Sequence, residues 1–590
     1  MANSGLPSTV ATPNTPLGNT KTKVLKSVRV RMYRHGLGDC FLITFTNSQG
    51  EKHHIMIDCG VLPMSSGANQ RLDIAVQNIL QETGGHIHTL VATHEHADHI
   101  SGFQSAREYL GIPSVELFDE DCKSPAKAKM ANNAKRPTID KVWLAWTENP
   151  EDEQRKQILQ RVETITLAVQ AAALGMGAEQ RKAIDDILLF NGAYLEADRG
   201  DQQDLRETFK DADAVTGTLP ATDQPQKPKY KLAVTMAKIM NSLRCYPVEY
   251  LEPEDNARGI AGFGVKVHIL GPSRKIGMLN SGGESPSGHE LRLKQSTAFM
   301  AAAVRSAGLE LEDQQPGGLS QADLTQLEAL SLPFDRSRFI ILDDARKISP
   351  TPAGDKPDQI QIAKYIDFFQ KHYGFKDDAA SYGDEWRRID KDWLQMGETL
   401  ALQQVSVINN TSLVLAFELE ESGKVLLFPG DAELESWEKW HENPNMAHLL
   451  NHTVLYKVGH HGSINATDQE ILKSTMTNPD LVALIPVDMA RANENVWEFP
   501  AKSLFDVQKQ TGALFDQTRG RILVAVKARE VEVVNDGNKE ISWERIEEYS
   551  KPAKPPKAKI SKQKWAQFTR AITLGEPMGT PLWVDYTINL

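Results

Sequence analysis

The first hundred residues contain short runs in which apolar and polar side chains alternate. "SVRVRMYRH" (27–35) alternates strictly, and "CFLITFT" (40–46) and "HHIMIDCG" (53–60) are further apolar runs of strand length. Alternation with a period of two places every second side chain on one face of a sheet, so we predict three strands. In "NQRLDIAVQNILQET" (69–83) the apolar residues recur at helical spacing, and a Gly-Gly pair ends the predicted helix. "IHTLVATH" (87–94) predicts a buried strand after it.

Strand-like patterns return after two long stretches of different composition. Residues 111–244 are rich in Ala, Lys, Glu, Gln and Leu, which predicts a helical insertion. Residues 273–400 are polar and punctuated by Gly and Pro, and we expect a second insertion with one strand (338–344) and one helix (361–374). Short strands are predicted at "GVKVHILGP" (264–272), "VSVINN" (405–410), "TSLVLAFEL" (411–419), "KVLLFPGD" (424–431), "TVLYKVGHHGS" (453–463), "LVALIPV" (481–487) and "RILVAVKARE" (521–530).

The chain has 590 residues, which is too long for one compact core without additions. We therefore predict an α/β domain assembled from residues 25–110, 245–272 and 401–530, with the two insertions between its parts. Residues 1–24 have no apolar segment of signal-peptide type and are expected to form a disordered tail. The C-terminal extension, 531–590, contains the Lys/Pro-rich stretch "YSKPAKPPKAKISKQK", read as a linker, and closes with the strand-like "PLWVDYTINL".

Composition narrows the classes of function. The net charge of −12 disfavours sequence-blind coating of duplex DNA, although local contact with nucleic acid stays open. No apolar run is long enough to span a bilayer, so no membrane contact is expected. The four scattered cysteines suit a reducing compartment, and we expect a cytoplasmic bacterial protein. The lysines of the C-terminal linker could contact a nucleic-acid backbone, but a solvated linker is the simpler interpretation.

The densest group of metal-type ligands lies in "LVATHEHADHISGF" (90–103). His94 and His96 are two residues apart in an extended segment, so both side chains can reach one ion. Asp98 and His99 open a helix and can hold a second ion a few ångströms away, and a pair of divalent ions can activate one water. Histidine and carboxylate ligands suit zinc, with manganese or iron as alternatives. A polar loop whose histidines merely cap a helix is the weaker interpretation.

Further ligands of a two-ion site should come from other strand ends. Asp431 follows the strand "KVLLFPGD" as a candidate bridging carboxylate, and His460-His461 follow "TVLYKV" as candidates for the last ligand. Asp58 ends "HHIMIDCG" and is more suited to orienting a ligand by a hydrogen bond than to binding the ion. Each signal alone is weak, because an Asp after a strand is most often a turn former. Asp58, the segment from His94 to His99, Asp431 and His460-His461 each follow an apolar strand. These four signals together favour one shared site.

In these motifs the chain resembles the metallo-β-lactamase superfamily, and within it the hydrolase domain of competence DNA-uptake proteins. The strings "GLGDCFLI", "NNTSLVL", "LLFPGD" and "KVGHHGS" support the closer resemblance. The resemblance implies an αββα sandwich and hydrolysis by a metal-bound hydroxide, with two zinc ions expected. By this resemblance, the first ion would be held by His94, His96 and Asp431. The second would be held by Asp98, His99, Asp431 and His461, with His460 as the alternative to His461. The resemblance also implies that Asp98 orients the hydroxide and that the pocket is lined by Asp39, Asn410, Lys457 and Ser463.

Two positions depart from the family pattern. Many relatives carry another ligand histidine where this chain has Ile408-Asn409-Asn410-Thr411-Ser412, so one ion is expected to bind weakly or to be completed by water. Relatives also tend to carry a histidine where this chain has Phe499. We interpret the remaining strand-edge histidines, at 53, 54, 86 and 88, as surface residues rather than ligands.

The resulting hypothesis is a metal-dependent hydrolase, with phosphodiesterase or nuclease activity as the leading form. The first alternative is a hydrolase of small esters, lactones or phosphorylated molecules, in which the insertions cover the site. The second alternative is a defence or interaction protein in which the fold binds a partner and the metal is structural. The substrate and the oligomeric state are not predicted from the sequence.

Overall fold

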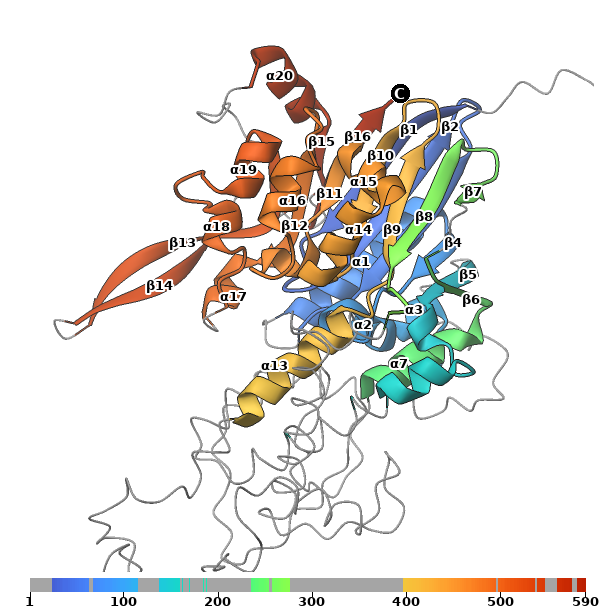
Figure 1. The fold of residues 1–590 in the computed structure, drawn as a ribbon, viewed down its shortest axis with the longest axis horizontal. Coiled ribbons are helices and arrows are strands. Elements are labelled where there is room, and N and C mark those ends of the chain that lie inside the picture. Colours follow the sequence, from blue (N-terminus) through green and yellow to red (C-terminus); the bar gives the residue numbers. More distant parts are fainter. Residues whose placement is uncertain are drawn as a thin grey trace, which may run out of the picture.

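A computed structural model gives the fold of the chain (Figure 1). It describes residues 24–62, 67–114, 137–159, 235–253, 257–275, 396–494, 497–535, 538–546, 560–575 and 581–590, with single positions at 162, 169, 184 and 187. The predicted strand at 338–344 and helix at 361–374, the N-terminal tail and most of the Lys/Pro-rich stretch lie outside these residues.

The first sheet has eight strands in the order β15-β16-β1-β2-β3-β4-β5-β6. Strands β15 to β3 run antiparallel to their neighbours in the sheet, whereas β3, β4, β5 and β6 run parallel. The parallel strands therefore end at the same edge. The strands are β1 (Leu25–Tyr33), β2 (Cys40–Asn47), β3 (Lys52–Cys59), β4 (His86–Val91), β5 (Thr138–Ala145), β6 (Val248–Leu251), β15 (Ile572–Gly575) and β16 (Trp583–Asn589).

The second sheet has the order β14-β13-β12-β11-β10-β9-β8-β7. It repeats the plan of the first, because β7 to β10 are antiparallel and β10 to β13 are parallel. The strands are β7 (Arg258–Ile260), β8 (Val265–Gly271), β9 (Val414–Leu419), β10 (Lys424–Phe428), β11 (Thr453–Lys457), β12 (Val482–Asp488), β13 (Ile522–Asn535) and β14 (Asn538–Ile546). The long β13–β14 ribbon extends away from the body of the molecule (Figure 1).

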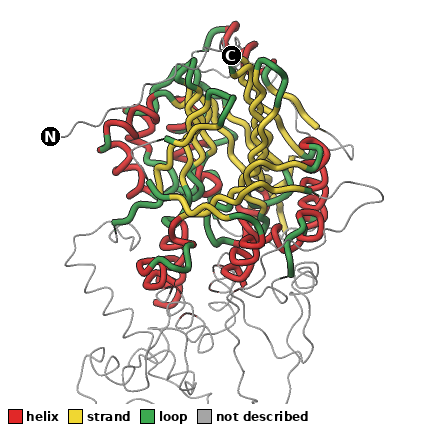
Figure 2. Tube along the Cα trace, turned by 90° about the vertical axis from the view of Figure 1, so that its right-hand side faces the viewer, coloured by secondary structure: helices red, strands yellow, loops and turns green. Residues whose placement is uncertain are grey.

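The two sheets pack face to face through alternate apolar side chains. In β1 these are Val28, Val30 and Met32, which join a buried cluster drawn from strands of both sheets. Phe41 of β2 meets Phe428 of β10 edge-on, with ring centroids 5.8 Å apart. Helices cover the outer faces, so that two layers of strands lie between helices (Figure 2). The predicted α/β class and two-sheet sandwich are confirmed.

The helices pack on the faces of the two sheets that point away from each other. The predicted helix at 69–83 is confirmed as α1, which buries Leu72, Val76 and Ile79 and ends at left-handed Gly84. The other helices are α2 (Ala97–Ser105), α3 (Arg107–Leu110), α7 (Thr235–Ser242), α13 (Met396–Asn409), α14 (Leu434–Glu442), α15 (Pro444–Asn451), α16 (Gln469–Ser474), α17 (Met489–Glu494), α18 (Lys502–Phe505), α19 (Ala513–Thr518) and α20 (Lys562–Arg570), and α1 spans Ala68–Thr83.

Three local predictions need correction. "VSVINN" does not form a strand but the last turns of α13, because its three apolar residues fit a buried helix as well as a strand. The predicted insertion at 111–244 contains β5, which lies between β4 and β6 in the first sheet. The end of the predicted Lys/Pro linker is helical, since α20 begins at Lys562 and buries Trp565.

The C-terminal strand lies in the core sheet beside the N-terminal one. Arg31 of β1 donates from Nε and Nη2 to the two carboxylate oxygens of Asp585 in β16, at 2.7 and 2.8 Å. Both residues are buried. A bidentate pair of this kind fixes the register of the two strands.

We expect Asp585→Ala to lower the free energy of unfolding by about 3 kcal/mol, because it removes the bidentate carboxylate from the buried Arg31 guanidinium, whose Nη1 keeps only Asn78 at 2.6 Å and Glu82 at 3.6 Å. Urea denaturation in metal-free buffer measures the effect. The control is Glu420→Ala, which breaks an exposed pair with Lys266 at 3.4 Å and should cost about 1 kcal/mol or less. Equal losses in the two variants would contradict the prediction.

His35 lies fully buried at the turn after β1 and donates a hydrogen bond from Nε2 to the carbonyl of Gly60, at 2.7 Å. Burial lowers the pKa of His35 from 6.5 to about 4. The unfolded chain therefore binds this proton below pH 6.5 while the folded chain does not. Stability associated with His35 is complete above pH 6.5 and is lost as the pH falls toward 4.

We accordingly expect that lowering the pH reduces the free energy of unfolding more steeply in the wild type than in His35→Gln. The difference should approach about 1.4 kcal/mol per pH unit between pH 6 and pH 4.5, measured by urea denaturation with a chelator present. Parallel pH profiles for the two proteins would show that the pKa of His35 is unchanged by folding.

Candidate metal centre

Loops from both sheets meet at one edge of the sandwich. In the first sheet, β3 ends beside Asp58, and β4 leads through Thr93 and His94 into α2. In the second sheet, β10 leads to Asp431, and β11 leads to the turn Gly459–Gly462. Because the parallel strands point the same way, residues more than 300 positions apart come into contact here.

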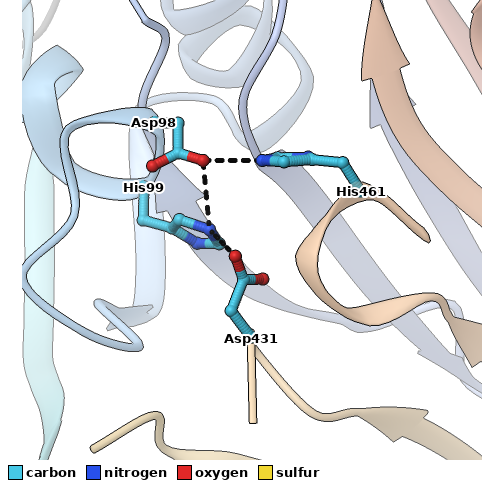
Figure 3. A group of neighbouring side chains, drawn as sticks. All are labelled: Asp98, His99, Asp431 and His461. Carbon is cyan, nitrogen blue, oxygen red and sulfur yellow. Dashed lines mark hydrogen bonds and ion pairs between the residues drawn. The ribbon is translucent and has the colours of Figure 1, made fainter. Parts of the chain in front are cut away.

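Four side chains form the centre of this edge: Asp98, His99, Asp431 and His461 (Figure 3). His461 Nε2 lies 2.6 Å from Asp98 Oδ2, and His99 Nε2 lies 3.1 Å from Asp431 Oδ2 and 3.8 Å from Asp98 Oδ2. All four are fully buried, and their ligand atoms lie within 4.8 Å of one another. Two imidazoles and two carboxylates at this spacing can surround one divalent ion.

The ligand atoms of these four side chains are better suited to binding a cation than to bonding with one another. Asp98 Oδ1 is buried without a hydrogen-bond partner, and the buried His99 Nε2 and Asp431 Oδ2 have each other as an ion pair at 3.1 Å. Burying carboxylate oxygens without compensation is unfavourable. A divalent ion among the four side chains would balance the charge of both carboxylates, so these residues fit the metal that the motifs imply.

Hydrogen bonds from behind orient two of the imidazoles. Asp58 Oδ2 lies 2.8 Å from His99 Nδ1, and the Asp58 carboxylate also accepts bonds from the backbone N–H and hydroxyl of Thr93, both at 2.8 Å. His461 Nδ1 lies 2.6 Å from the carbonyl of Pro486. These contacts place a proton on Nδ1 of each ring and direct Nε2 toward the centre. Asp58 thus contacts a ligand candidate from outside, where the sequence predicted an orienting residue.

Lys457 supplies a fixed positive charge beneath the centre. Its Nζ lies 2.6 Å from Asp39 Oδ2 and 3.2 Å from Asp431 Oδ1, and it donates to the carbonyl of Gly430 at 2.9 Å. Burial opposes its charge, but the two carboxylates outweigh burial and raise the pKa of Lys457. Two of the predicted pocket residues, Asp39 and Lys457, are therefore an internal ion pair that positions Asp431.

The turn after β11 uses its two histidines differently. The side chain of His461 enters the centre, whereas His460 donates its backbone N–H to Asp431 Oδ1 at 2.8 Å. Both residues have left-handed backbone conformations, with φ of 43° and 53°. A left-handed backbone conformation costs a histidine little energy, but it is uncommon, and such conformations cluster at functional sites. The ring of His460 packs against Phe499, with centroids 5.5 Å apart.

His94 and His96 form a neighbouring pair rather than a complete group. His94 Nε2 lies 3.0 Å from His96 Nδ1, and His94 Nδ1 lies 3.3 Å from the hydroxyl of Ser412. Burial lowers the pKa of both histidines, which keeps the rings neutral. In the part of the chain that the structure describes, no third ligand atom joins them in a group of the kind that Asp98, His99, Asp431 and His461 make.

The two remaining pocket candidates lie outside the centre. Asn410 accepts a hydrogen bond from the backbone of Glu433 at 3.2 Å, which supports the loop that carries Asp431. Ser463 donates to Asn465 within its own loop. Sequence reasoning did not assign roles to Thr93 or Glu433, although each lies within two residues of a predicted ligand or orienting partner along the chain.

Electrostatics within the centre are dominated by its carboxylates. Burial disfavours the charged form of His99, but Asp431, Asp39 and Asp98 outweigh burial and raise its pKa. The pKa of His461 is raised as well, because the hydrogen bond to Asp98 overcomes the effect of burial. In turn, His99 and His461 lower the pKa of Asp98 against the effect of burial. The site therefore holds positive charge as protons where it could hold a metal ion.

A comparison with protein families finds the metallo-β-lactamase superfamily, whose model matches residues 33–156, less than half of the chain. The match includes Asp39, Asp58 and the segment from His94 to His99, whereas Asp431 and His461 lie beyond it. The αββα sandwich predicted from the motifs is the fold of this chain. No curated protein and no solved structure matches the chain. In the described residues, no helix is long and apolar enough to cross a membrane.

Proposed function

From a metallo-β-lactamase superfamily domain at residues 33–156 and a buried His/Asp centre, we infer that the chain is a metal-dependent hydrolase. We propose phosphodiesters as its substrates, with nuclease activity as the leading form. One observation supports the proposal most: two carboxylates and two imidazoles, from Asp98, His99, Asp431 and His461, are fully buried with ligand atoms within 4.8 Å of one another. The phosphodiester specificity rests on the resemblance to the hydrolase domain of competence DNA-uptake proteins.

Asp98, His99, Asp431 and His461 would hold one divalent ion, and His94 and His96 would help to hold a second. A divalent ion here would supply Lewis acidity and lower the pKa of a water molecule. The protein's own groups fix the geometry: Asp58 and the Pro486 carbonyl orient the two imidazoles, and His99 and Lys457 lower the pKa of Asp431 against the effect of burial. The ring of Phe499 lies against those of His460 and His461, with centroids 5.5 and 6.2 Å away.

The two ions should differ in affinity. We expect the four-residue centre to bind the first ion tightly and the His94/His96 pair to bind the second at least about tenfold more weakly, because that pair lacks a third ligand histidine. Titration of the metal-free chain with Mn²⁺ in a calorimeter measures both events. His94→Gln should remove the weak event and leave the tight one within about threefold, while Asp98→Ala should remove the tight one. Two events of equal affinity would contradict this order.

The activity is tested with single-stranded DNA, a small phosphodiester, an ester and a lactone, using wild type and Asp98→Ala with metal analysis of both. Phosphodiester cleavage that falls by at least about 10³-fold in Asp98→Ala supports the proposal. The matched control is Asp480→Ala, which changes an exposed carboxylate before β12 that pairs with Lys564 and should retain full activity. Turnover of esters or lactones alone would refute the phosphodiester specificity, and full metal occupancy without turnover of any substrate would refute the hydrolase.

A further inference from the structure

A second group of histidines lies at the opposite end of the same parallel strands. His53 and His54 begin β3, and His86 and His88 begin β4, whereas the candidate metal centre follows the other ends of these strands. Asp140 lies next to them in β5. From His88 to His94 the chain advances six residues, which corresponds to roughly 20 Å along a strand. This group is therefore separate from the candidate metal centre.

The side chains of this group are packed closely together. The rings of His86 and His88 are stacked, with centroids 4.1 Å apart, and the rings of His53 and His88 lie 4.3 Å apart. His86 Nε2 lies 2.9 Å from both carboxylate oxygens of Asp140. Ligand atoms of His86, His88 and Asp140 lie within 4.8 Å of one another. Around a tetrahedral zinc the corresponding separation is about 3.3 Å, so only small side-chain movements separate this group from a coordination site.

Folding alone does not account for this arrangement. His86 and Asp140 are about half exposed, and an exposed ion pair of this kind contributes little to stability. Burial and the neighbouring imidazoles lower the pKa of His53 to about 3 and of His54 to about 4, and the pKa of His88 is lowered for the same reasons. Their rings are therefore neutral at pH 7, which is the form that binds metals.

We propose that His86, His88 and Asp140 form a second, peripheral site for a divalent transition-metal ion of the zinc class. Two imidazoles and a carboxylate are ligands that zinc accepts, and exposure leaves a coordination position for water. His88 Nδ1 accepts a hydrogen bond from the backbone N–H of His54 at 3.1 Å. Coordination through this nitrogen would replace one hydrogen bond by a stronger metal–nitrogen bond. The ion would tie β4 to β5 at the end remote from the candidate metal centre.

The test is calorimetric titration of the metal-free, full-length chain with Zn²⁺ alone. We use an Asp431→Asn/His94→Gln background, in which the four-residue centre and the neighbouring His94/His96 pair are both disabled, so that the result does not depend on the proposed hydrolase. One event should remain in this background, and adding His86→Gln and His88→Gln should weaken it at least tenfold. Asp140→Asn should weaken the same event and provides a second variant if the double substitution impairs folding.

The matched control is His268→Gln. His268 is another half-exposed strand histidine with a carboxylate partner, Glu418 at 2.7 Å, but it belongs to no group of three potential ligands among the described residues. This variant should bind Zn²⁺ as its background does. Zinc binding that is absent in the Asp431→Asn/His94→Gln background, or unchanged there by both His86→Gln/His88→Gln and Asp140→Asn, would overturn the peripheral site.

Discussion

Asp431→Asn should abolish tight metal binding and reduce hydrolysis by at least about 10³-fold, which corresponds to about 4 kcal/mol of transition-state stabilisation. The carboxylate is fully buried and contacts three groups: His99 Nε2 at 3.1 Å, Lys457 Nζ at 3.2 Å and the backbone N–H of His460 at 2.8 Å. An amide keeps the shape but loses the charge that holds a cation. Calorimetric titration with Mn²⁺ and an assay on single-stranded DNA measure the two losses.

The same substitution should leave the fold intact, because Asp39 still pairs with Lys457 at 2.6 Å. Far-UV circular dichroism and the urea midpoint serve as controls. A folded Asp431→Asn protein that binds Mn²⁺ as tightly as the wild type would show that Asp431 is not a ligand.

Gly60→Ala should disrupt the centre without changing any candidate ligand. A Cβ atom at Gly60 would lie 2.2 Å from the backbone carbon of Asp98 and 2.2 Å from the backbone nitrogen of His99. The first turn of α2 must therefore move away by more than 1 Å, and it carries both side chains with it. We expect a loss of about 3 kcal/mol or more in the free energy of unfolding and at least a 10²-fold rise in the Mn²⁺ dissociation constant.

Gly259→Ala provides the comparison for Gly60→Ala. Gly259 lies in β7, has no left-handed backbone angle, and a Cβ atom there would meet nothing within 4 Å. The same methyl group should change stability by less than about 1 kcal/mol at this position. If the two variants unfold at the same urea concentration and bind Mn²⁺ equally, the close approach of Gly60 to α2 is not required.

Local patterns in the sequence predict most single elements of the fold. The alternation in β1 and the helical spacing in α1 are strong signals, because one face of each element is buried. The segment at Val405–Asn410 misled the prediction, since its helical character depends on the preceding residues of α13. The pairing of β16 with β1 has no local signal at all, because strand partners so far apart in sequence are selected by tertiary packing.

The candidate site likewise combines residues that the sequence indicates with contacts that have no local signal. The spacing of His94, His96, Asp98 and His99 indicates metal chemistry from a single loop, and Asp431 and His461 stand out because each follows an apolar strand. The choice of His461 over His460 for the centre depends on backbone angles that the sequence does not reveal. The ion pair between Lys457 and Asp39 joins the end of β11 to the turn before β2 in the other sheet, so no spacing along the chain could indicate it.

The neighbour of β1 on its outer edge, β16, is synthesised long after β1. Arg31 and Asp585 are separated by 554 positions. A ribosome that adds about 5–20 residues per second needs roughly half a minute to two minutes to cover that distance. During this time the N–H and C=O groups along one side of β1 lack their final partners, and an open strand edge can pair with other chains. A nascent or truncated chain without β16 therefore exposes an aggregation-prone edge that closes only when β16 pairs with β1.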